Sequence, residues 1–172
     1  MHMLLGMVPR EQTLYQYYTG STRSHGEGRT ADNVGGAGFH APRMGDPTAL
    51  RLEQRIDGFV SADSAYAGGE LVTAPFELES DSISINIDTS ASGDARAALL
   101  DESRGPIGGF ALDDSDRSQG NDTGLTLTWR GTGDVSALKG RRVRLLIRSR
   151  NAKFYAVYAG SRAESPASPA LA

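Results

Sequence analysis

Four aspartates lie close together in the stretch LDDSDRSQGND, where carboxylates could bind a calcium ion or a sugar. They are Asp113, Asp114, Asp116 and Asp122. Read from Asp114 as an EF-hand loop, the stretch places Gln119 where glycine is required and Leu125 where glutamate is required. Two interpretations stay open. One is a loop in water, and the other is a structural calcium near Asp114 and Asp116, with Asp113 and Asp116 as candidate ligand-binding residues.

Histidine and tyrosine supply the next candidate chemistry. His25 and His40 lie in one glycine-rich stretch, where they could form a metal pair or act as acid and base beside a carboxylate. The alternative is that both are solvated loop side chains. Just upstream, LYQYYTG contains Tyr15 and Tyr17, which could face a ligand. We therefore treat these two tyrosines and two histidines as candidate ligand-binding residues.

Ser136 and Lys139 have the S-x-x-K spacing in which a lysine can activate a serine nucleophile. The partner motifs of that chemistry are absent from the sequence, and a short helical turn that Asp134 caps and Gly140 ends explains the spacing structurally. The chain contains no cysteine, which excludes disulfides and cysteine-ligated metals. The sequence therefore identifies no catalytic residue and predicts no cofactor apart from the calcium alternative.

Length and charge narrow the class of protein. The chain has 172 residues, 21 glycines and 7% aromatics, which indicates one ordinary domain with appendages and many turns. A formal net charge of −3 disfavours nucleic acid and anionic membranes as partners. The opening MHMLLGMVP lacks the basic start and cleavage site of a signal peptide, so a cytoplasmic location is the default expectation.

The sequence divides into three parts with different patterns. Residues 12–19 predict a strand with aromatic side chains on both faces, followed by a long glycine-rich loop. We expect this strand and loop to make up residues 1–49, and a β-sandwich to make up residues 50–160. The Pro-, Ala- and Ser-rich run 161–172 predicts a disordered tail.

Eight or nine short strands are predicted between the turns, without a strong helical pattern. They predict an all-β, antiparallel β-sandwich of jelly-roll-like type. The clearest strand is SISINID. In it, Ile83, Ile85 and Ile87 share a face that we expect to be buried, whereas Ser84 and Asn86 share a face that we expect to meet water.

A second strand, in RRVRLLIRSR, carries a basic stripe. Alternation places Val143, Leu145 and Ile147 inward and the arginines outward. The outward arginines are Arg142, Arg144, Arg148 and Arg150. Such a stripe could contact phosphates, but the acidic net charge favours ion pairs with neighbouring strands. Trp129, the only tryptophan, lies on the apolar face of LTLTW, which favours core packing over sugar stacking.

A family resemblance is carried by the stretches RIDGFVSADS, GELVTAPFEL and LTLTWRGTGDVSALKGRRVRLLIRSRNAKFYAVY. Together they resemble the C-terminal β-sandwich of bacterial glycosidase-like proteins related to the invertase and levanase furanosidases. In that family a β-propeller precedes the sandwich, and LYQYYTGSTRSHG is similar to the last propeller strand and the loop that leaves it. The resemblance covers residues 14–158. The family's catalytic carboxylates lie in the propeller motifs W-x-N-D-P-N, R-D-P and E-C, and none of these occurs here.

The resemblance implies a carbohydrate-associated β-sandwich module of a glycoside-hydrolase-like protein without the usual propeller active site. Because the strand at 12–19 has apolar side chains on two faces, we expect a homo-oligomer in which a second copy covers it. The alternative is a small hydrolase, a glycosidase, whose site is assembled between subunits from residues 15–40 and the acidic loop. Whether the protein is an enzyme stays open, and carbohydrate is the expected ligand in either case.

Overall fold

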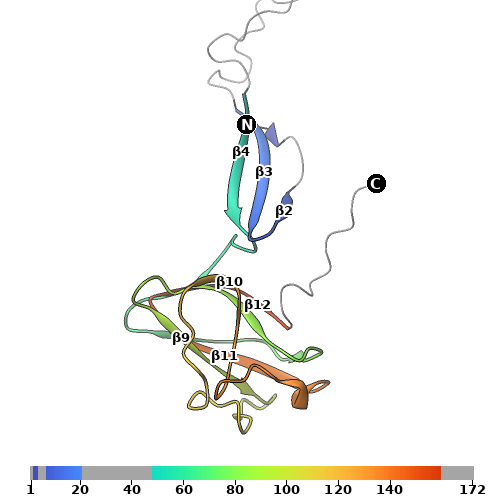
Figure 1. Ribbon diagram of the computed structural model, residues 1–172, viewed down its shortest axis with the longest axis vertical. Coiled ribbons are helices and arrows are strands. Elements are labelled where there is room, and N and C mark those ends of the chain that lie inside the picture. Colours follow the sequence, from blue (N-terminus) through green and yellow to red (C-terminus); the bar gives the residue numbers. More distant parts are fainter. Residues whose placement is uncertain (1, 4–6, 21–47, 160–172) are drawn as a thin grey trace, which may run out of the picture. The chain divides into compact units, whose positions relative to one another are not determined.

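The computed structural model describes residues 2–3, 7–20 and 48–159, and within them it is almost entirely β-structure (Figure 1). Every paired strand in these residues is antiparallel. The chain divides into two compact units, residues 1–56 and residues 57–172, which we call the N-terminal unit and the sandwich unit. The predicted all-β, antiparallel, sandwich-like fold is confirmed. Expectations for residues 21–47 and for the tail at 161–172 lie outside the described residues.

The N-terminal unit is a single sheet centred on β3 (Thr13–Gly20). One edge of β3 pairs with β4 (Thr48–Arg55) along its whole length, from Thr13 opposite Arg55 to Gly20 opposite Thr48. The other edge pairs with β2 (Val8–Arg10) and β1 (His2–Met3). Both edges of β3 are therefore paired within the N-terminal unit. Residues 50–55 were expected to begin the sandwich, whereas the structure places them in β4.

The two faces of β3 differ in composition as the alternation predicts. Leu14 and Gln16 are buried, and the Gln16 side chain donates a hydrogen bond from Nε2 to Oε1 of Gln54 at 3.1 Å. On the same face of β4, Leu50 and Leu52 remain 41% and 47% exposed. This face of the sheet therefore keeps apolar surface in contact with solvent.

The sandwich unit has two sheets, which Figure 1 shows as two layers. One sheet has the order β10-β8-β12-β5, and in the other β11 lies between β9 on one edge and β6 and β7 on its other edge. The first contains β5 (Ala62–Ser64), β8 (Ser84–Asp88), β10 (Asn121–Thr126) and β12 (Ala152–Tyr158). The second contains β6 (Gly69–Val72), β7 (Phe76–Glu77), β9 (Asp94–Leu100) and β11 (Arg142–Arg150).

Residues from both sheets form the core of the sandwich unit. Ile85 and Ile87 from one sheet and Leu145 and Ile147 from the other are at most 1% exposed. Trp129 is also buried, and its ring meets Phe110 edge-to-face at 5.4 Å between centroids. The predicted inward faces of 83–87 and 143–147, and the core position of Trp129, are confirmed.

One prediction about β8 is wrong. Ser84 and Asn86 were expected to meet water, but both are fully buried. Side chains of a strand stand on the two faces of its sheet, so the pairing with β10 and β12 covers only the edges of β8, and the burial of Ser84 and Asn86 shows that its outer face is covered as well. No buried side-chain polar atom in the described residues lacks a hydrogen-bond partner, as burial of polar groups requires.

The turn before β11 forms as the sequence predicts. A single 3-10 turn, η2 (Ser136–Leu138), follows Asp134, whose Oδ1 accepts a hydrogen bond from the Ser136 N–H at 2.8 Å. Gly140 ends the turn with a φ of 77°, a left-handed conformation that glycine adopts without strain. The S-x-x-K spacing of Ser136 and Lys139 is therefore part of a capped turn.

Candidate functional site

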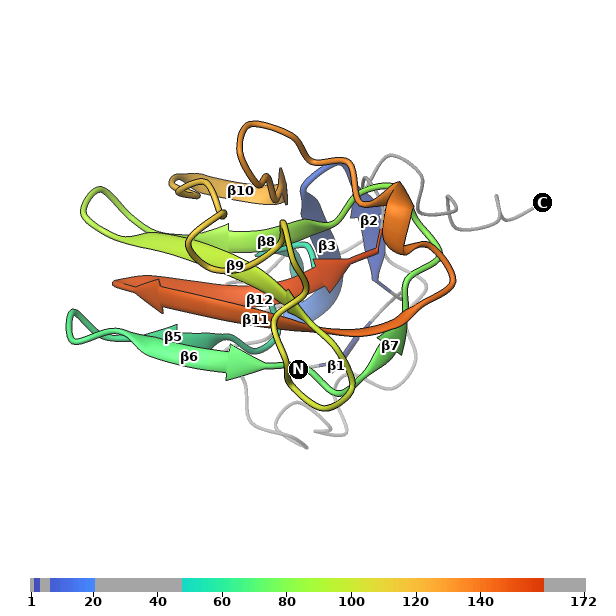
Figure 2. The ribbon, with the colours of Figure 1, turned by 90° about the horizontal axis from the view of Figure 1, so that it is seen from below.

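The outer face of the β6–β11–β9 sheet carries the strongest concentration of charged side chains in register. Because Ala95 and Ala97 of β9 point into the core, Asp94 and Arg96 point outward. The strand register sets Arg150 opposite Asp94, and it sets Arg148 opposite Arg96 on one side and Glu70 on the other. Figure 2 shows β11 running beside β6 and β9. Five charged side chains from three strands thus share one surface.

These side chains line an open cleft of about 430 Å³. Its walls are Glu70, Asp94, Arg96, Arg148 and Arg150, with the turn at 67–69 forming one end. Gly68 in that turn has a φ of 84°, and a Cβ atom there would lie 3.3 Å from the carbonyl oxygen of Ser149. Glycine therefore allows the turn to pass close to β11, which closes this end of the cleft.

Ion pairs hold most of the charged groups in place. Glu70 Oε1 accepts from Arg148 Nη2 at 2.7 Å, and Asp94 Oδ2 accepts from Arg150 Nε at 2.8 Å and from Arg117 Nη2 at 2.9 Å. Burial would raise the pKa of Asp94, but the hydrogen bonds and charges of Arg150 and Arg117 outweigh it and hold this pKa below its usual value. Asp94 is therefore a carboxylate at neutral pH.

Arg96 differs from the other cleft arginines. It makes no ion pair with any of the described residues, although its charge contributes to lowering the pKa of Asp116. Its cross-strand neighbour is Arg148, another cation. The guanidinium of Arg96 thus keeps its donors available to a molecule in the cleft.

An exposed aromatic ring adjoins the cleft. Tyr66 precedes the turn at 67–69 and is 70% exposed. The guanidinium carbon of Arg150 lies 5.7 Å from the centroid of the Tyr66 ring, within the range of a cation–π contact. The site thus combines an apolar ring face with planar groups that can form pairs of hydrogen bonds.

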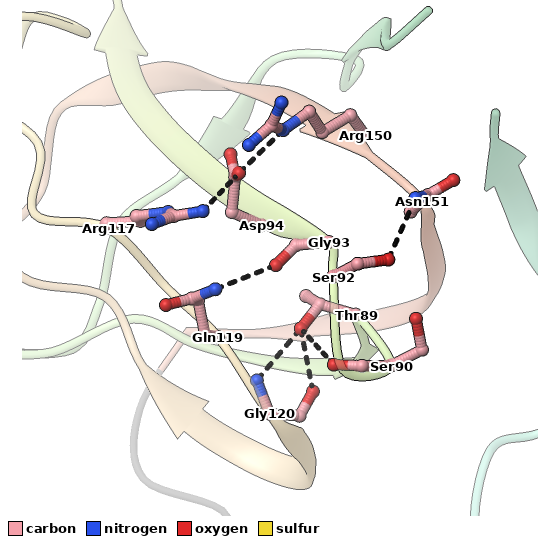
Figure 3. A network of polar contacts seen from close by, with 10 residues as sticks. All are labelled: Thr89, Ser90, Ser92, Gly93, Asp94, Arg117, Gln119, Gly120, Arg150 and Asn151. Carbon is pink, nitrogen blue, oxygen red and sulfur yellow. Dashed lines mark hydrogen bonds and ion pairs between the residues drawn. The ribbon is translucent and has the colours of Figure 1, made fainter. Parts of the chain in front are cut away.

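A network of polar contacts beside the cleft fixes Asp94 and Arg150 (Figure 3). The segment at 117–120 is bound to the β8–β9 connection, because Gln119 Nε2 donates to the Gly93 carbonyl at 3.0 Å and the Gly120 N–H donates to Thr89 Oγ1 at 2.9 Å. On the other side, Asn151 Nδ2 donates to Ser92 Oγ at 3.1 Å. The ends of β8, β9 and β11 are therefore held together where the cleft begins.

The acidic stretch at 113–122 is occupied by contacts within the protein. Asp114 Oδ1 accepts from Arg130 at 2.5 Å, and Asp116 Oδ2 accepts from the Gly131 N–H at 2.7 Å. Hydrogen bonds from the Thr128 side chain and from Gly131 hold the pKa of Asp116 below its usual value. Asp113 is exposed. In the described part of the chain, no group of three or more His, Asp or Glu side chains is placed to hold a metal ion, and calcium here stays a prediction.

Among the other predicted site residues, the structure describes Tyr15 and Tyr17. Tyr15 lies in the N-terminal unit, where the guanidinium of Arg51 stacks over its ring at 4.8 Å and pairs with Glu53. Tyr17 lies on the same face of β3 and is half-buried. His25 and His40 lie outside the described residues. Lys139 Nζ forms an ion pair with Asp81 at 3.0 Å.

Sequence reasoning found part of the cleft and missed the rest. It predicted that the outward arginines of β11 pair with neighbouring strands, and the Arg148–Glu70 and Arg150–Asp94 pairs confirm this. It did not single out Arg96. The available signal was the period-two pattern of DARAALL, in which Asp94 and Arg96 alternate with buried alanines.

Comparisons with protein-family models, curated proteins and solved structures found no match to this chain. The resemblance to the invertase and levanase furanosidases therefore stays a prediction. Within the described residues, no helix has the length and apolar character needed to cross a membrane.

Proposed function

We propose that this protein is a carbohydrate-associated β-sandwich module of a glycoside-hydrolase-like protein, and that it binds sugar in the cleft on the β6–β11–β9 face. One observation carries the proposal: the exposed ring of Tyr66, which directly precedes the lining turn and lies against Arg150, stands beside the planar charged side chains of the cleft. Sugar hydroxyls accept and donate hydrogen bonds in adjacent pairs, which carboxylates and guanidiniums match. The C–H faces of a sugar ring pack on an aromatic face.

The ordered surroundings of the cleft support this role. Ligand binding is favoured when binding groups are fixed before the ligand arrives, because less side-chain freedom is then lost. Asp94 is held by Arg150 and Arg117, and Glu70 is held by Arg148. Each carboxylate keeps a lone pair for a sugar hydroxyl, since a carboxylate can accept about four hydrogen bonds.

Self-association belongs to the same proposal. One face of the N-terminal sheet keeps Leu50 and Leu52 nearly half exposed, and on the opposite face Val8, which is across from Tyr15, is 46% exposed. Burial of such side chains against a second copy of the sheet would contribute favourable free energy, about 25 cal/mol for each Å² of apolar surface removed from water. The second copy is the occupant that we propose.

The test is calorimetric titration of the full chain with a panel of oligosaccharides. We expect one or more of them to bind, and Tyr66→Ala to weaken binding about fivefold to tenfold through loss of ring stacking. Phe59→Ala is the matched control, because Phe59 is another exposed aromatic side chain of the sandwich unit, at 58% exposure, and it is eight residues before the lining turn that Tyr66 directly precedes. An absence of binding across the panel, or equal weakening by both substitutions, would contradict the proposal.

The hydrolase alternative is tested with the same protein. The purified oligomer is assayed for release of nitrophenol from aryl glycosides. Activity that is lost when the oligomer dissociates would favour a glycosidase with a site between subunits. Binding of oligosaccharides without hydrolysis favours the non-catalytic module.

A further inference from the structure

The arrangement of Arg96 and Arg148 leaves the guanidinium of Arg96 without an ion pair to any residue that the structure describes. The two arginines are directly opposite each other on β9 and β11 and point to the same face of the sheet. Like charges at such cross-strand positions repel, which destabilises the pair. Glu70 relieves this for Arg148 alone, because its carboxylate is bound to that side chain.

The carboxylates that line the cleft form no ion pair with Arg96. Asp94 is shared between Arg150 and Arg117, and Glu70 is bound to Arg148. Asp116 lies outside the lining: the charge of Arg96 contributes to lowering its pKa, but its hydrogen bonds come from Thr128 and Gly131, so the N–H donors of Arg96 stay available. Three guanidiniums therefore face two carboxylates in the cleft lining, in a chain whose formal net charge is −3.

We infer that the sugar bound in this cleft is acidic, with the carboxylate of a uronic acid residue paired to the guanidinium of Arg96. This inference rests on the proposed function. A guanidinium presents its N–H groups in a planar fork that matches a carboxylate with two parallel hydrogen bonds. Beside that contact, the ring of a neighbouring sugar can pack on Tyr66, so the two recognition features act on one oligosaccharide.

The sugar acid is favoured over a nucleic acid by the charge of the protein. Binding to a phosphate backbone rests on several cationic contacts at once. In this cleft Arg148 and Arg150 are already ion-paired, which leaves one unpaired guanidinium in the described lining. One such cation suits an oligosaccharide with a carboxylate at the matching position.

The experiment compares tetragalacturonate with its methyl ester, which keeps the same sugar backbone but removes the charge. Calorimetric titration of the full chain should give binding of the acid about tenfold to hundredfold tighter than binding of the ester, as expected for one hydrogen-bonded charge. Arg96→Gln should reduce binding of the acid to the level of the ester. Arg141→Gln is the matched control, since Arg141 is exposed, lies before β11 and does not line the cleft.

The folding of Arg96→Gln is checked by its melting temperature. It should equal or exceed that of the unmodified protein, because the substitution removes a like-charge contact. If this variant melts lower, Arg96→Lys serves as the second variant: it keeps the charge but loses the fork, and it should also weaken binding of the acid.

Each outcome decides between the proposals. Equal binding of acid and ester would overturn the acidic-sugar inference and leave the proposed carbohydrate binding in place. If the protein binds neither of them and no other oligosaccharide of the panel, both proposals are overturned. If Arg96→Gln binds the acid as tightly as the unmodified protein does, the inference is also overturned. Competition by acetate or sulfate as strong as that by the tetrasaccharide would show a general anion site. Binding of a short single-stranded DNA more tightly than the tetrasaccharide would show a nucleic-acid site. Either result overturns the acidic-sugar inference.

Discussion

The indole Nε1 of Trp129 donates a hydrogen bond of 2.9 Å to the carbonyl oxygen of Ala97. This contact joins the segment after β10 to the backbone of β9, and both residues belong to the core of the sandwich unit. Because both groups are buried, neither could exchange the contact for one with water. The sole tryptophan therefore serves the fold rather than a ligand.

Trp129→Phe should destabilise the sandwich unit by about 2 kcal/mol. The substitution removes the hydrogen bond to Ala97 and leaves part of the indole volume empty. Chemical denaturation followed by circular dichroism measures the change. Val60→Ala, at a side chain that is 77% exposed, should change the free energy of unfolding little. A stability equal to that of the unmodified protein would show that the indole contact contributes nothing.

Gly93→Ala should destabilise the chain by about 3 kcal/mol, because there is no space for a side chain. A Cβ atom at this position would lie 2.2 Å from the Asn151 carbonyl oxygen and 2.4 Å from that of Thr89. Gly108→Ala is the control, since a Cβ atom there meets nothing within 4 Å. The melting temperatures of the two variants measure the difference in stability. Equal melting temperatures would contradict the close approach of these backbones.

Asp94→Asn should destabilise the protein at neutral pH by about 1 kcal/mol, the usual scale for partly exposed ion pairs. The pKa of Asp94 is lower in the folded protein than its usual value, so its contribution is present above about pH 4 and is lost as pH falls through the folded pKa. The difference in melting temperature between the variant and the unmodified protein should therefore shrink below pH 4. A difference that grows with acidity would contradict the assignment. Asp81→Asn is the control, because the ion pair between Asp81 and Lys139 is exposed to solvent.

Ile85→Ala should destabilise the sandwich unit by about 3 kcal/mol. Ile85 is fully buried in the core cluster, so truncation removes apolar contacts and leaves a cavity. Urea denaturation measures the loss. A loss no larger than that of Val60→Ala would mean that the inward face of β8 is wrongly assigned.

Tyr15→Ser combined with Tyr17→Ser should shift the protein toward the monomer if self-association uses β3. Both side chains lie on one face of this strand and are only half-buried within one chain. Light scattering measures the mass of each variant. Tyr66→Ser is the control, because Tyr66 lies in the sandwich unit and should leave the mass unchanged. A monodisperse, folded monomer of the unmodified chain would rule out the proposed oligomer.

Local patterns in the sequence predict the main strands of the sandwich unit and the apolar side chains that they bury. Alternation with period two is local, so it placed Val143, Leu145 and Ile147 in the core and the arginines of β11 outside. The local signals of Asp134 and Gly140 likewise predicted the turn before β11. These features depend only on residues near each other in the chain.

The pairing of the strands and their register depend on contacts between distant parts of the chain, which local patterns do not reveal. Strand pairing is made by backbone groups that every residue carries, so the sequence did not reveal that β4 completes the sheet of β3, or that β8 is covered on both faces. The cleft is the clearest case: Arg148 and Glu70 are 78 residues apart and Arg150 and Asp94 are 56 apart. A register shifted by one residue would turn one partner of each pair into the core and remove the site.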